Sequence, residues 1–286
     1  MGSRNSHDTP PAVRLKWRVC GWSRKGSPVG ERSDMIAVIS DIHANREALE
    51  AVLEELGKLK PAKIICLGDI VGYGPDPVWC VDTVKKECNV VLGGNHDYAL
   101  IYGAKDFSES AGTTVRYHRQ MLMPRMDRTA EDQRRAERWD FLKGLPHRYQ
   151  EDSLLYVHAS PRNPVSEYLQ ERDCRMNLQK KLTTNFSLVP WLCFHGHTHQ
   201  PGVITEDFKY IKPKHFYKAE EGRKAIINVG SVGQPRDSDP RACFVTLDGT
   251  EVQYVRVEYD IEAAIKKIQS LGGLDPSFPA RLRAGI

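Results

Sequence analysis

Five short segments rich in Asp, Asn and His constrain this chain most, because each follows or ends a run of residues typical of a buried strand. They are Ser40–His43, Gly68–Asp69, Gly94–Asp97, Val157–Ala159 and Gly196–His199. The first three runs alternate with stretches of helical spacing, and strand–helix–strand order predicts a parallel α/β sheet. In such a sheet, polar groups that follow the strands meet at one edge, where ligands bind. The sequence therefore predicts a site that gathers these five segments.

The first half of the chain predicts regular βαβ units. Asn45 can cap a helix whose apolar residues recur at helical spacing until Pro61, and a second helix is expected from about Pro77 to Cys88. The first three strands are expected at Ile36–Ser40, Ile64–Leu67 and Val90–Leu92. Residues 104–150 are charged and lack strand signals, so we expect an inserted helical pair near 109–122 and 131–143. This pair is expected to form one wall or a partial lid of the cleft.

The second half predicts mostly strands. They are expected at Leu154–Val157, Trp191–Phe194, Gly202–Glu206, Ala225–Val229, Ala242–Leu247 and Val252–Glu258, with a hairpin turn at Asp248-Gly249. A helix near 260–270 and then a polar tail with Pro276 and Pro279 are expected to follow. Two sheets packed on each other, with helices outside, are the simplest architecture for this pattern.

The charge of the chain is concentrated in its first 34 residues. They hold seven Lys/Arg and three Asp/Glu, out of 41 and 37 in the chain, so residues 35–286 carry 34 of each. The neutral remainder gives no case for a nucleic-acid surface. Residues 1–34 show no apolar period and predict a disordered basic extension, whereas 35–286 predict one domain.

Other features of the composition concern location. No apolar run approaches the roughly 18 residues of a membrane span. The seven cysteines are odd in number and show no CxxC spacing. This pattern favours a reduced, cytoplasmic protein over a disulfide framework.

Each polar segment has an ordinary alternative when it is taken alone. Asp69 can be a turn residue, Asp97 can cap a helix, and a buried histidine such as His158 is commonly a satisfied core residue. The five segments in one order, each at a strand end, favour a shared site instead. Carboxylate, amide and imidazole ligands suit divalent Mn, Fe, Ni or Zn. Two such ions can bind both the attacking and the leaving oxygen of a phosphoryl displacement.

In this order, D-x-H, G-D, G-N-H-D, H and G-H-x-H, the segments resemble the signature of the calcineurin-like metallophosphoesterase superfamily. The resemblance covers roughly residues 35–258 and implies a four-layer α/β/β/α sandwich. It implies that Asp41, His43 and His199 hold one metal ion, that Asn95, His158 and His197 hold the other, and that Asp69 bridges them. It also implies that His96 faces the phosphate, with Asp97 orienting its ring.

The chain is further similar to one branch of this superfamily, the small bacterial phosphodiesterases, which also contains a retromer subunit that acts as a scaffold. Ile70–Gly74 stands where protein phosphatases carry Asp-Arg-Gly, and Asn228–Arg236 resembles a later block of that branch. Three loop residues, Tyr73, Arg162 and Arg236, are candidates for substrate contact. For each, a packed or solvated loop side chain is the alternative.

The predicted activity is hydrolysis of a small phosphodiester by a hydroxide that bridges two divalent ions, which lower its pKa. A phosphomonoesterase or nucleotide hydrolase with the same site is the alternative enzyme, and a scaffold protein with a decayed site is the non-enzymatic alternative. His96 is present together with all the expected ligands, which argues against the scaffold.

Overall fold

The structure of the protein is a computed structural model that describes residues 34–105, 107–271, 274 and 276–286. The prediction of a disordered extension concerns residues 1–34, of which 1–33 lie outside the described residues. The described residues from Asp34 onward fall within one compact unit.

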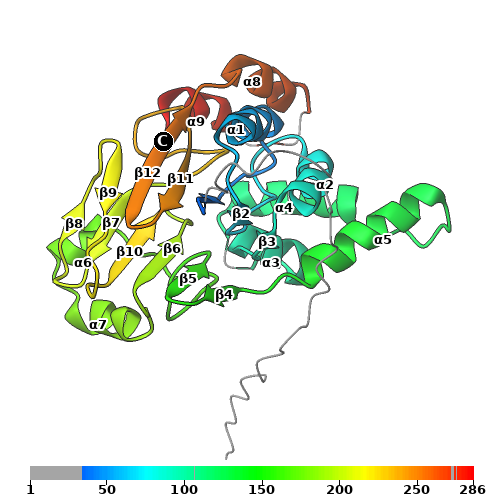
Figure 1. The fold of residues 1–286 in the computed structure, drawn as a ribbon. Coiled ribbons are helices and arrows are strands. Elements are labelled where there is room, and N and C mark those ends of the chain that lie inside the picture. Colours follow the sequence, from blue (N-terminus) through cyan, green and yellow to red (C-terminus); the bar gives the residue numbers. More distant parts are fainter. Residues whose placement is uncertain (1–33, 106, 272–273, 275) are drawn as a thin grey trace, which may run out of the picture. The chain divides into compact units, whose positions relative to one another are not determined.

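This unit is built on two six-stranded mixed sheets (Figure 1). The first sheet has the order β3 (Val90–Val91), β2 (Lys63–Cys66), β1 (Ile36–Ile39), β11 (Ala242–Asp248), β12 (Glu251–Val257) and β9 (Phe216–Lys218). The second has the order β4 (Arg148–Glu151), β5 (Leu154–Val157), β6 (Leu192–His195), β10 (Ala225–Asn228), β7 (Gly202–Thr205) and β8 (Tyr210–Ile211). Strands β1, β2 and β3 run parallel, as do β5, β6 and β10, and the other neighbours are antiparallel.

Side-chain alternation along the central strands divides the core into layers. Ala37 and Ile39 of β1 belong to a cluster with the helices of the first sheet, whereas Val38 shares a cluster with Phe194 of β6. Cys193, next to Phe194, belongs to a third cluster with helix α7 (Gln179–Ser187). Successive strand residues point to opposite faces, so the two sheets face each other and the helices lie outside. The predicted four-layer α/β/β/α sandwich is confirmed.

Helix α1 (Arg46–Leu59) follows the loop after β1, and the predicted N-cap residue Asn45 links the start of the helix to this loop. Asn45 Oδ1 accepts the Ala48 N–H at 3.2 Å, and its side-chain amide donates to Gly233 O at 2.9 Å. The helix ends before Pro61 at Lys60, whose φ is 53°. Helices α2 (Pro77–Glu87) and α8 (Ile261–Ser270) also match the sequence prediction.

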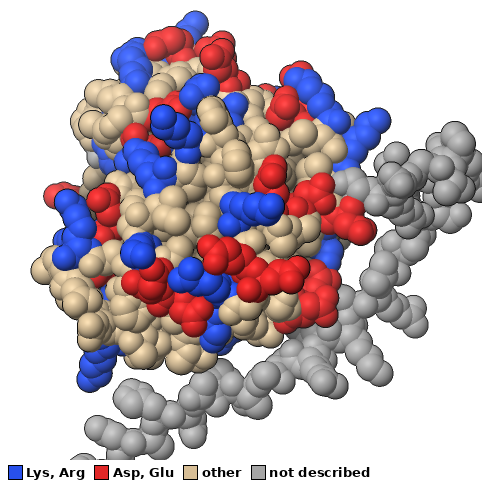
Figure 2. All heavy atoms as spheres, turned by 60° about the vertical axis from the view of Figure 1, so that its left-hand side comes forward, with Lys and Arg blue, Asp and Glu red and all other residues tan. Residues whose placement is uncertain are grey.

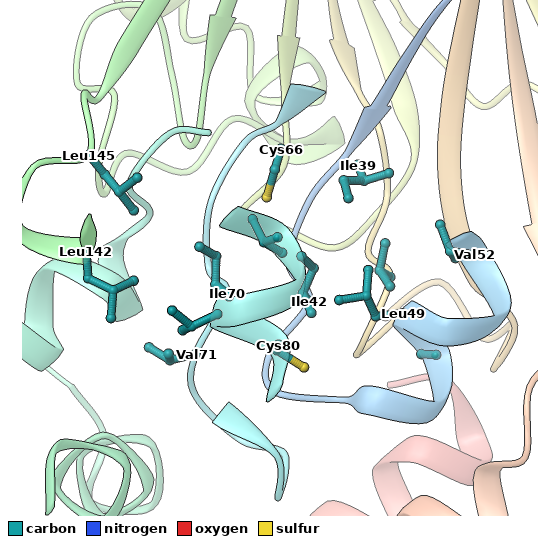
Figure 3. Close-up of a cluster of buried hydrophobic side chains, with 14 of the residues drawn as sticks. Ile39, Ile42, Leu49, Val52, Cys66, Ile70, Val71, Cys80, Leu142 and Leu145 are labelled. Carbon is teal, nitrogen blue, oxygen red and sulfur yellow. The ribbon is translucent and has the colours of Figure 1, made fainter. Parts of the chain in front are cut away.

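The inserted helices α4 (Glu109–Leu122) and α5 (Ala130–Lys143) lie close to their predicted positions. With α3 (Asn95–Tyr102) they share the first sheet's outer core. Figure 3 shows Leu142 and Leu145, at the end of this insertion, in the cluster that holds Ile70 and Val71 of the loop after β2. The insertion therefore packs against the loop that carries Asp69.

The prediction of a polar tail at the end of the chain was wrong. Residues Phe278–Ala284 form helix α9, in which Phe278 and Leu282 are each 1% exposed and pack with α8. Pro279 lies in the first turn of the helix, where its missing N–H costs no hydrogen bond. The short elements β4, β8, β9, α6 (Glu171–Arg175) and α7 were also not predicted.

Two further properties concern the charge of the surface and the apolar character of the helices. Figure 2 shows Lys and Arg side chains interspersed with Asp and Glu on the face in view. Among the described residues, no helix has both the length and the apolar character needed to cross a membrane.

Candidate metal centre

The predicted ligands lie on loops that leave the parallel strands of both sheets. Asp41 and His43 follow β1, and Asp69 follows β2. His158 follows β5, and His197 and His199 follow β6, while Asn95 opens α3 after β3. All of them except Asn95 are 5% exposed or less. The carboxyl ends of the two sets of parallel strands thus place their polar residues in one buried cluster.

These loops hold several ligand residues in the left-handed backbone region. The φ angles are 55° at Asp41, 51° at His43, 51° at Asp69, 63° at His197 and 59° at His199. For a non-glycine residue this conformation costs about 1–2 kcal/mol. Interlocking hydrogen bonds maintain it: Asp41 N donates to Gly68 O at 3.0 Å, and His43 N donates to Asp69 O at 2.8 Å. Such strain persists where the surroundings fix it, which is common at functional sites.

The first ligand group consists of Asp41, His43 and His199. The two histidines donate Nδ1–H to the backbone oxygens of Val71, at 3.1 Å, and Gln234, at 2.6 Å. Their Nε2 lone pairs therefore face each other at 3.1 Å, and Asp41 Oδ1 lies 3.2 Å from His199 Nε2. Two facing lone pairs repel each other unless a cation lies between them.

The second ligand group contains Asp69, His158 and His197. His158 Nε2 lies 3.4 Å from Asp69 Oδ2 and 3.0 Å from Asn95 Oδ1, so the predicted asparagine joins this group. His197 donates Nε2–H to Ser166 O at 3.2 Å, which leaves its Nδ1 as the atom that can bind a metal. The two groups therefore contain all seven predicted ligands.

Asp69 lies between the two groups. Its Oδ2 is 3.6 Å from His43 Nε2 in the first group and 3.4 Å from His158 Nε2 in the second. Its Oδ1 accepts the backbone N–H of His96 at 2.8 Å, which fixes the carboxylate plane. One carboxylate oxygen is thus directed at histidines of both groups.

The spacing and charge of these donors fit divalent metal ions. Bonds of about 2.0–2.2 Å that meet at roughly 90–110° place ligand atoms about 3.0–3.5 Å apart. The separations between ligand atoms named above, together with the 3.8 Å between Asp41 Oδ1 and His43 Nε2, run from 3.0 Å to 3.8 Å, and all Asp and His ligand atoms of each group lie within 4.8 Å of one another.

Burial raises the pKa of Asp41, but His199 outweighs it and holds that pKa well below its usual range. Burial lowers the pKa of His197 to about 3, so the carboxylate of Asp41 and the neutral imidazole of His197, the forms that bind metals, are both favoured. Burial also lowers the pKa of His158, but the Asp69 carboxylate outweighs it and raises that pKa to about 9.

A model of the calcineurin-like phosphoesterase superfamily domain matches residues 35–251. The chain belongs to the calcineurin-like phosphoesterase superfamily. It is 34% identical over 244 residues to an uncharacterized protein of Methanocaldococcus jannaschii, a match that covers 82% of this chain and 91% of that protein. Membership of this phosphoesterase superfamily supports hydrolase activity, and the buried Asp and His residues are candidate ligands for the divalent metals that its members typically bind.

Two crystal structures share the fold of this superfamily member. A metallophosphoesterase from Sphaerobacter thermophilus is 36% identical, with a TM-score of 0.73 over 88% of this chain and 99% of that chain. A hypothetical protein from Pyrococcus horikoshii, at 19% identity, has a TM-score of 0.66 over 88% and 98% of the two chains. The second likeness concerns the fold alone.

His96 lies at the cluster of candidate ligands, and it forms a further compact group with His43 and Asp69. Its ring packs edge-on against Phe107, with the centroids 4.7 Å apart. A Cβ at Gly72 would lie 2.2 Å from His96 Nδ1, so only glycine fits there. This proximity leaves two roles for His96 in the phosphoesterase, contact with the phosphate or metal ligation.

Asp97 does not have the contacts predicted for it. Its carboxylate accepts the backbone N–H groups of Ile70 at 3.0 Å, Val71 at 3.2 Å and Gly94 at 3.0 Å. The physical reason is that consecutive helix residues point about 100° apart, so Asp97 at the start of α3 is directed away from the His96 ring. Asp97 instead ties the loop after Asp69 to the helix N-terminus.

The three candidate substrate residues of the phosphoesterase fall into two places. Tyr73 packs edge-on against His43, with the ring centroids 4.7 Å apart, and its hydroxyl accepts from Arg236 at 3.3 Å. Arg162 instead donates to Glu167, and no described contact brings its guanidinium to the metal cluster. The Arg162–Glu167 pair stabilises the loop whose Ser166 accepts the His197 hydrogen bond.

The block 228–236 surrounds the first ligand group. Ser231 Oγ donates to Asp41 O at 2.8 Å, and Gly233 N donates to the same oxygen at 2.9 Å. A Cβ at Gly233 would lie 1.8 Å from Ile42 O, so the close approach requires glycine. Asn228 donates to Gly196 O at 2.7 Å and supports the loop of His197 and His199. The block therefore holds the backbone on both sides of the first ligand group.

Sequence reasoning missed two aromatic residues at the site. Tyr168 is 47% exposed, and its ring centroid lies 4.1 Å from that of His197. His118 of α4 is fully buried and bonds the loop after Asp69. No motif contains either residue, and only long-range contacts bring them to the site.

Proposed function

We propose that this chain is a phosphodiesterase that uses two divalent ions. The observation that carries the proposal is the position of Asp69 Oδ2, 3.6 Å from His43 Nε2 and 3.4 Å from His158 Nε2. In this assignment Asp41, His43 and His199 hold one ion, Asn95, His158 and His197 hold the other, and Asp69 is shared. Mn, Fe, Ni and Zn all suit this mixed donor set.

Two divalent ions at such a site supply Lewis acidity and lower the pKa of water. The protein supplies the rest of the phosphate environment. The buried loops exclude water and fix the ligands, while His96 can donate a hydrogen bond or a proton at the phosphoryl group. Charge that develops on the phosphoryl oxygens is then stabilised by groups that are already in place.

Among the described residues, Arg236 is a cation whose guanidinium lies over the Tyr73 ring beside the ligand cluster, and we assign it to phosphate binding. Its guanidinium donates to two neutral oxygens, the Tyr73 hydroxyl at 3.3 Å and Gln234 Oε1 at 2.7 Å. Its Nε is buried and has no hydrogen-bond partner within the described part of the chain. Burial lowers the pKa of both His96 and His199, and the charge of Arg236 lowers both further. Among the described residues, the hydrogen bonds of this guanidinium go to neutral oxygens and not to a carboxylate, which favours an anionic substrate at this position.

We expect Arg236→Ala to lower kcat/KM for a phosphodiester by about 10–100-fold, since a hydrogen bond to a charged group contributes about 1.5–3 kcal/mol. The measurement is steady-state hydrolysis of bis-p-nitrophenyl phosphate. Arg223→Ala is the matched control, because it removes one positive charge from an exposed ion pair with Glu220. Equal activity of the two variants would exclude Arg236 from phosphate binding.

The proposed specificity predicts a higher kcat/KM for bis-p-nitrophenyl phosphate than for p-nitrophenyl phosphate. A monoester dianion carries about one more negative charge than a diester and needs more cations. Among the described residues, two arginines, Arg236 and Arg281, lie over the Tyr73 ring beside the cluster, and Arg162 is paired with Glu167. Both substrates release p-nitrophenolate, and the assay is repeated with Mn²⁺ and with Ni²⁺. A monoester preference of about tenfold or more with both metals would contradict the proposal.

A further inference from the structure

Helix α4 of the insertion directs His118 at the loop that follows Asp69. His118 is fully buried, its Nδ1 accepts the Gly72 N–H at 3.0 Å, and its Nε2–H donates to Gly74 O at 2.9 Å. Only a neutral imidazole can accept with one nitrogen and donate with the other. Burial lowers the pKa of His118 to about 3, which keeps the ring in that form.

The loop between these two hydrogen bonds has a backbone that needs support. Its φ angles are 97° at Gly72 and 57° at Tyr73, both in the left-handed region. Gly74 N donates to His43 O at 2.9 Å, and a Cβ at Gly74 would lie 2.4 Å from that oxygen. The loop is therefore held between His118 on one side and the metal-centre backbone on the other.

The inner side of the same loop contacts two residues of the site. Val71 O accepts the Nδ1–H of His43 at 3.1 Å, which directs the Nε2 lone pair of His43 toward the ligand group. The Tyr73 ring lies 4.7 Å from the His43 ring and 4.9 Å from the His96 ring. A shift of the loop would change the orientation of both histidines.

We propose that His118 is a positioning residue of the metal centre, which acts by holding residues 71–74 against His43 and His96. The inserted helices are then part of the site, because they supply the outer contact of this loop. The effect on hydrolysis rests on the proposed phosphodiesterase activity, whereas the effect on metal affinity rests only on metal binding at the candidate ligands. Outer partners of metal ligands contribute about 10–100-fold to metal affinity or activity when they are removed.

The test compares three substitutions of His118 in the full chain. His118→Phe keeps a ring but leaves Gly72 N and Gly74 O without their partner. His118→Gln keeps one acceptor and one donor on its amide, and His118→Asn keeps an acceptor near the Nδ1 position only. We expect His118→Phe to weaken Mn²⁺ binding, kcat/KM for bis-p-nitrophenyl phosphate, or both, by about 10–100-fold. The Mn²⁺ affinity and kcat/KM of the Gln variant should lie within about threefold of those of wild type. The values of the Asn variant should lie between those of the Gln and Phe variants.

Val115→Ala is the control for a general loss of stability, since Val115 lies on the same helix and is 1% exposed in the core. It should lower the melting temperature without changing Mn²⁺ affinity or kcat/KM. If His118→Phe does not fold, the proposal is decided by whether His118→Gln has a higher Mn²⁺ affinity and kcat/KM than His118→Asn. The proposal is overturned if His118→Phe binds Mn²⁺ and hydrolyses the diester as wild type does. It is also overturned if Val115→Ala loses as much Mn²⁺ affinity or kcat/KM as His118→Phe, or if these values are no higher for His118→Gln than for His118→Asn.

Mn²⁺ affinity is measured by competition with a chelator, independently of turnover. A wild-type chain that binds Mn²⁺ but cleaves no phosphodiester would contradict the proposed function. The positioning role would then still be decided by the Mn²⁺ affinities of the His118 variants.

Discussion

Asp69→Asn should leave the protein with less than one equivalent of metal and lower kcat/KM by at least about 10³-fold, since metal ions contribute several kcal/mol to phosphoryl chemistry. The Asp69 carboxylate is directed at His43 and at His158, so its charge serves both ligand groups. Asparagine has nearly the same shape, and its Oδ1 can still accept the His96 N–H that Asp69 accepts at 2.8 Å. The substitution therefore tests the charge rather than the fold.

Metal content is measured by elemental analysis after reloading and gel filtration. Variants of one-ion ligands, His199→Ala and His197→Ala, should each retain more metal than Asp69→Asn. Asp248→Asn, at the exposed hairpin between β11 and β12, is the matched carboxylate control and should retain wild-type content. Two retained equivalents in Asp69→Asn would exclude a shared carboxylate.

His96→Ala should lower kcat by about 10²–10⁴-fold, the usual contribution of a positioned proton-transfer group, while metal content stays near that of wild type. His96 borders the cluster, but both ligand groups are complete without it. Steady-state kinetics and elemental analysis on the same preparation separate the two roles open to this residue.

Phe107→Leu is the control for packing around His96, because Phe107 contacts that ring without belonging to either ligand group. It should change kcat by no more than about threefold. Parallel loss of metal and activity in His96→Ala would make His96 a ligand and would remove it from phosphate contact.

The fold, and the gathering of the candidate ligands in one place, were predictable because local patterns and motif order agreed. The apolar run Ile36–Ser40 predicted a buried strand, and β1 lies there; the structure adds that Val38 belongs to one core layer and Ile39 to another. The cap at Asn45 was predictable because an N-cap involves residues only three positions apart. The resemblance to the superfamily implied the seven ligand residues, and the meeting of parallel strand ends at one edge explains why the structure brings these residues together.

Contacts that depend on distant partners were not predictable. His118 has no signal in α4 itself, because Gly72 and Gly74 lie more than 40 positions away. Arg162 looked available for phosphate because it follows His158, and only the folded loop brings Glu167 to it. Helix α9 looked like a polar tail because its two apolar anchors, Phe278 and Leu282, are recognisable only by what they pack against.

The roles of neighbouring residues were the least predictable within the motifs. Asp97 is adjacent to His96 in the sequence, but the helical turn directs its carboxylate to the backbone of Ile70 and Val71. A motif gives residue order and not side-chain direction, and direction decides which groups meet.

The most direct test of the two-ion site is anomalous diffraction from crystals of the full chain equilibrated with Mn²⁺. Two peaks are expected about 3.5–4 Å apart, one on each side of Asp69 Oδ2. One peak is expected among Asp41, His43 and His199, and the other among Asn95, His158 and His197. A single peak at full occupancy, or none within this cluster, would contradict the account.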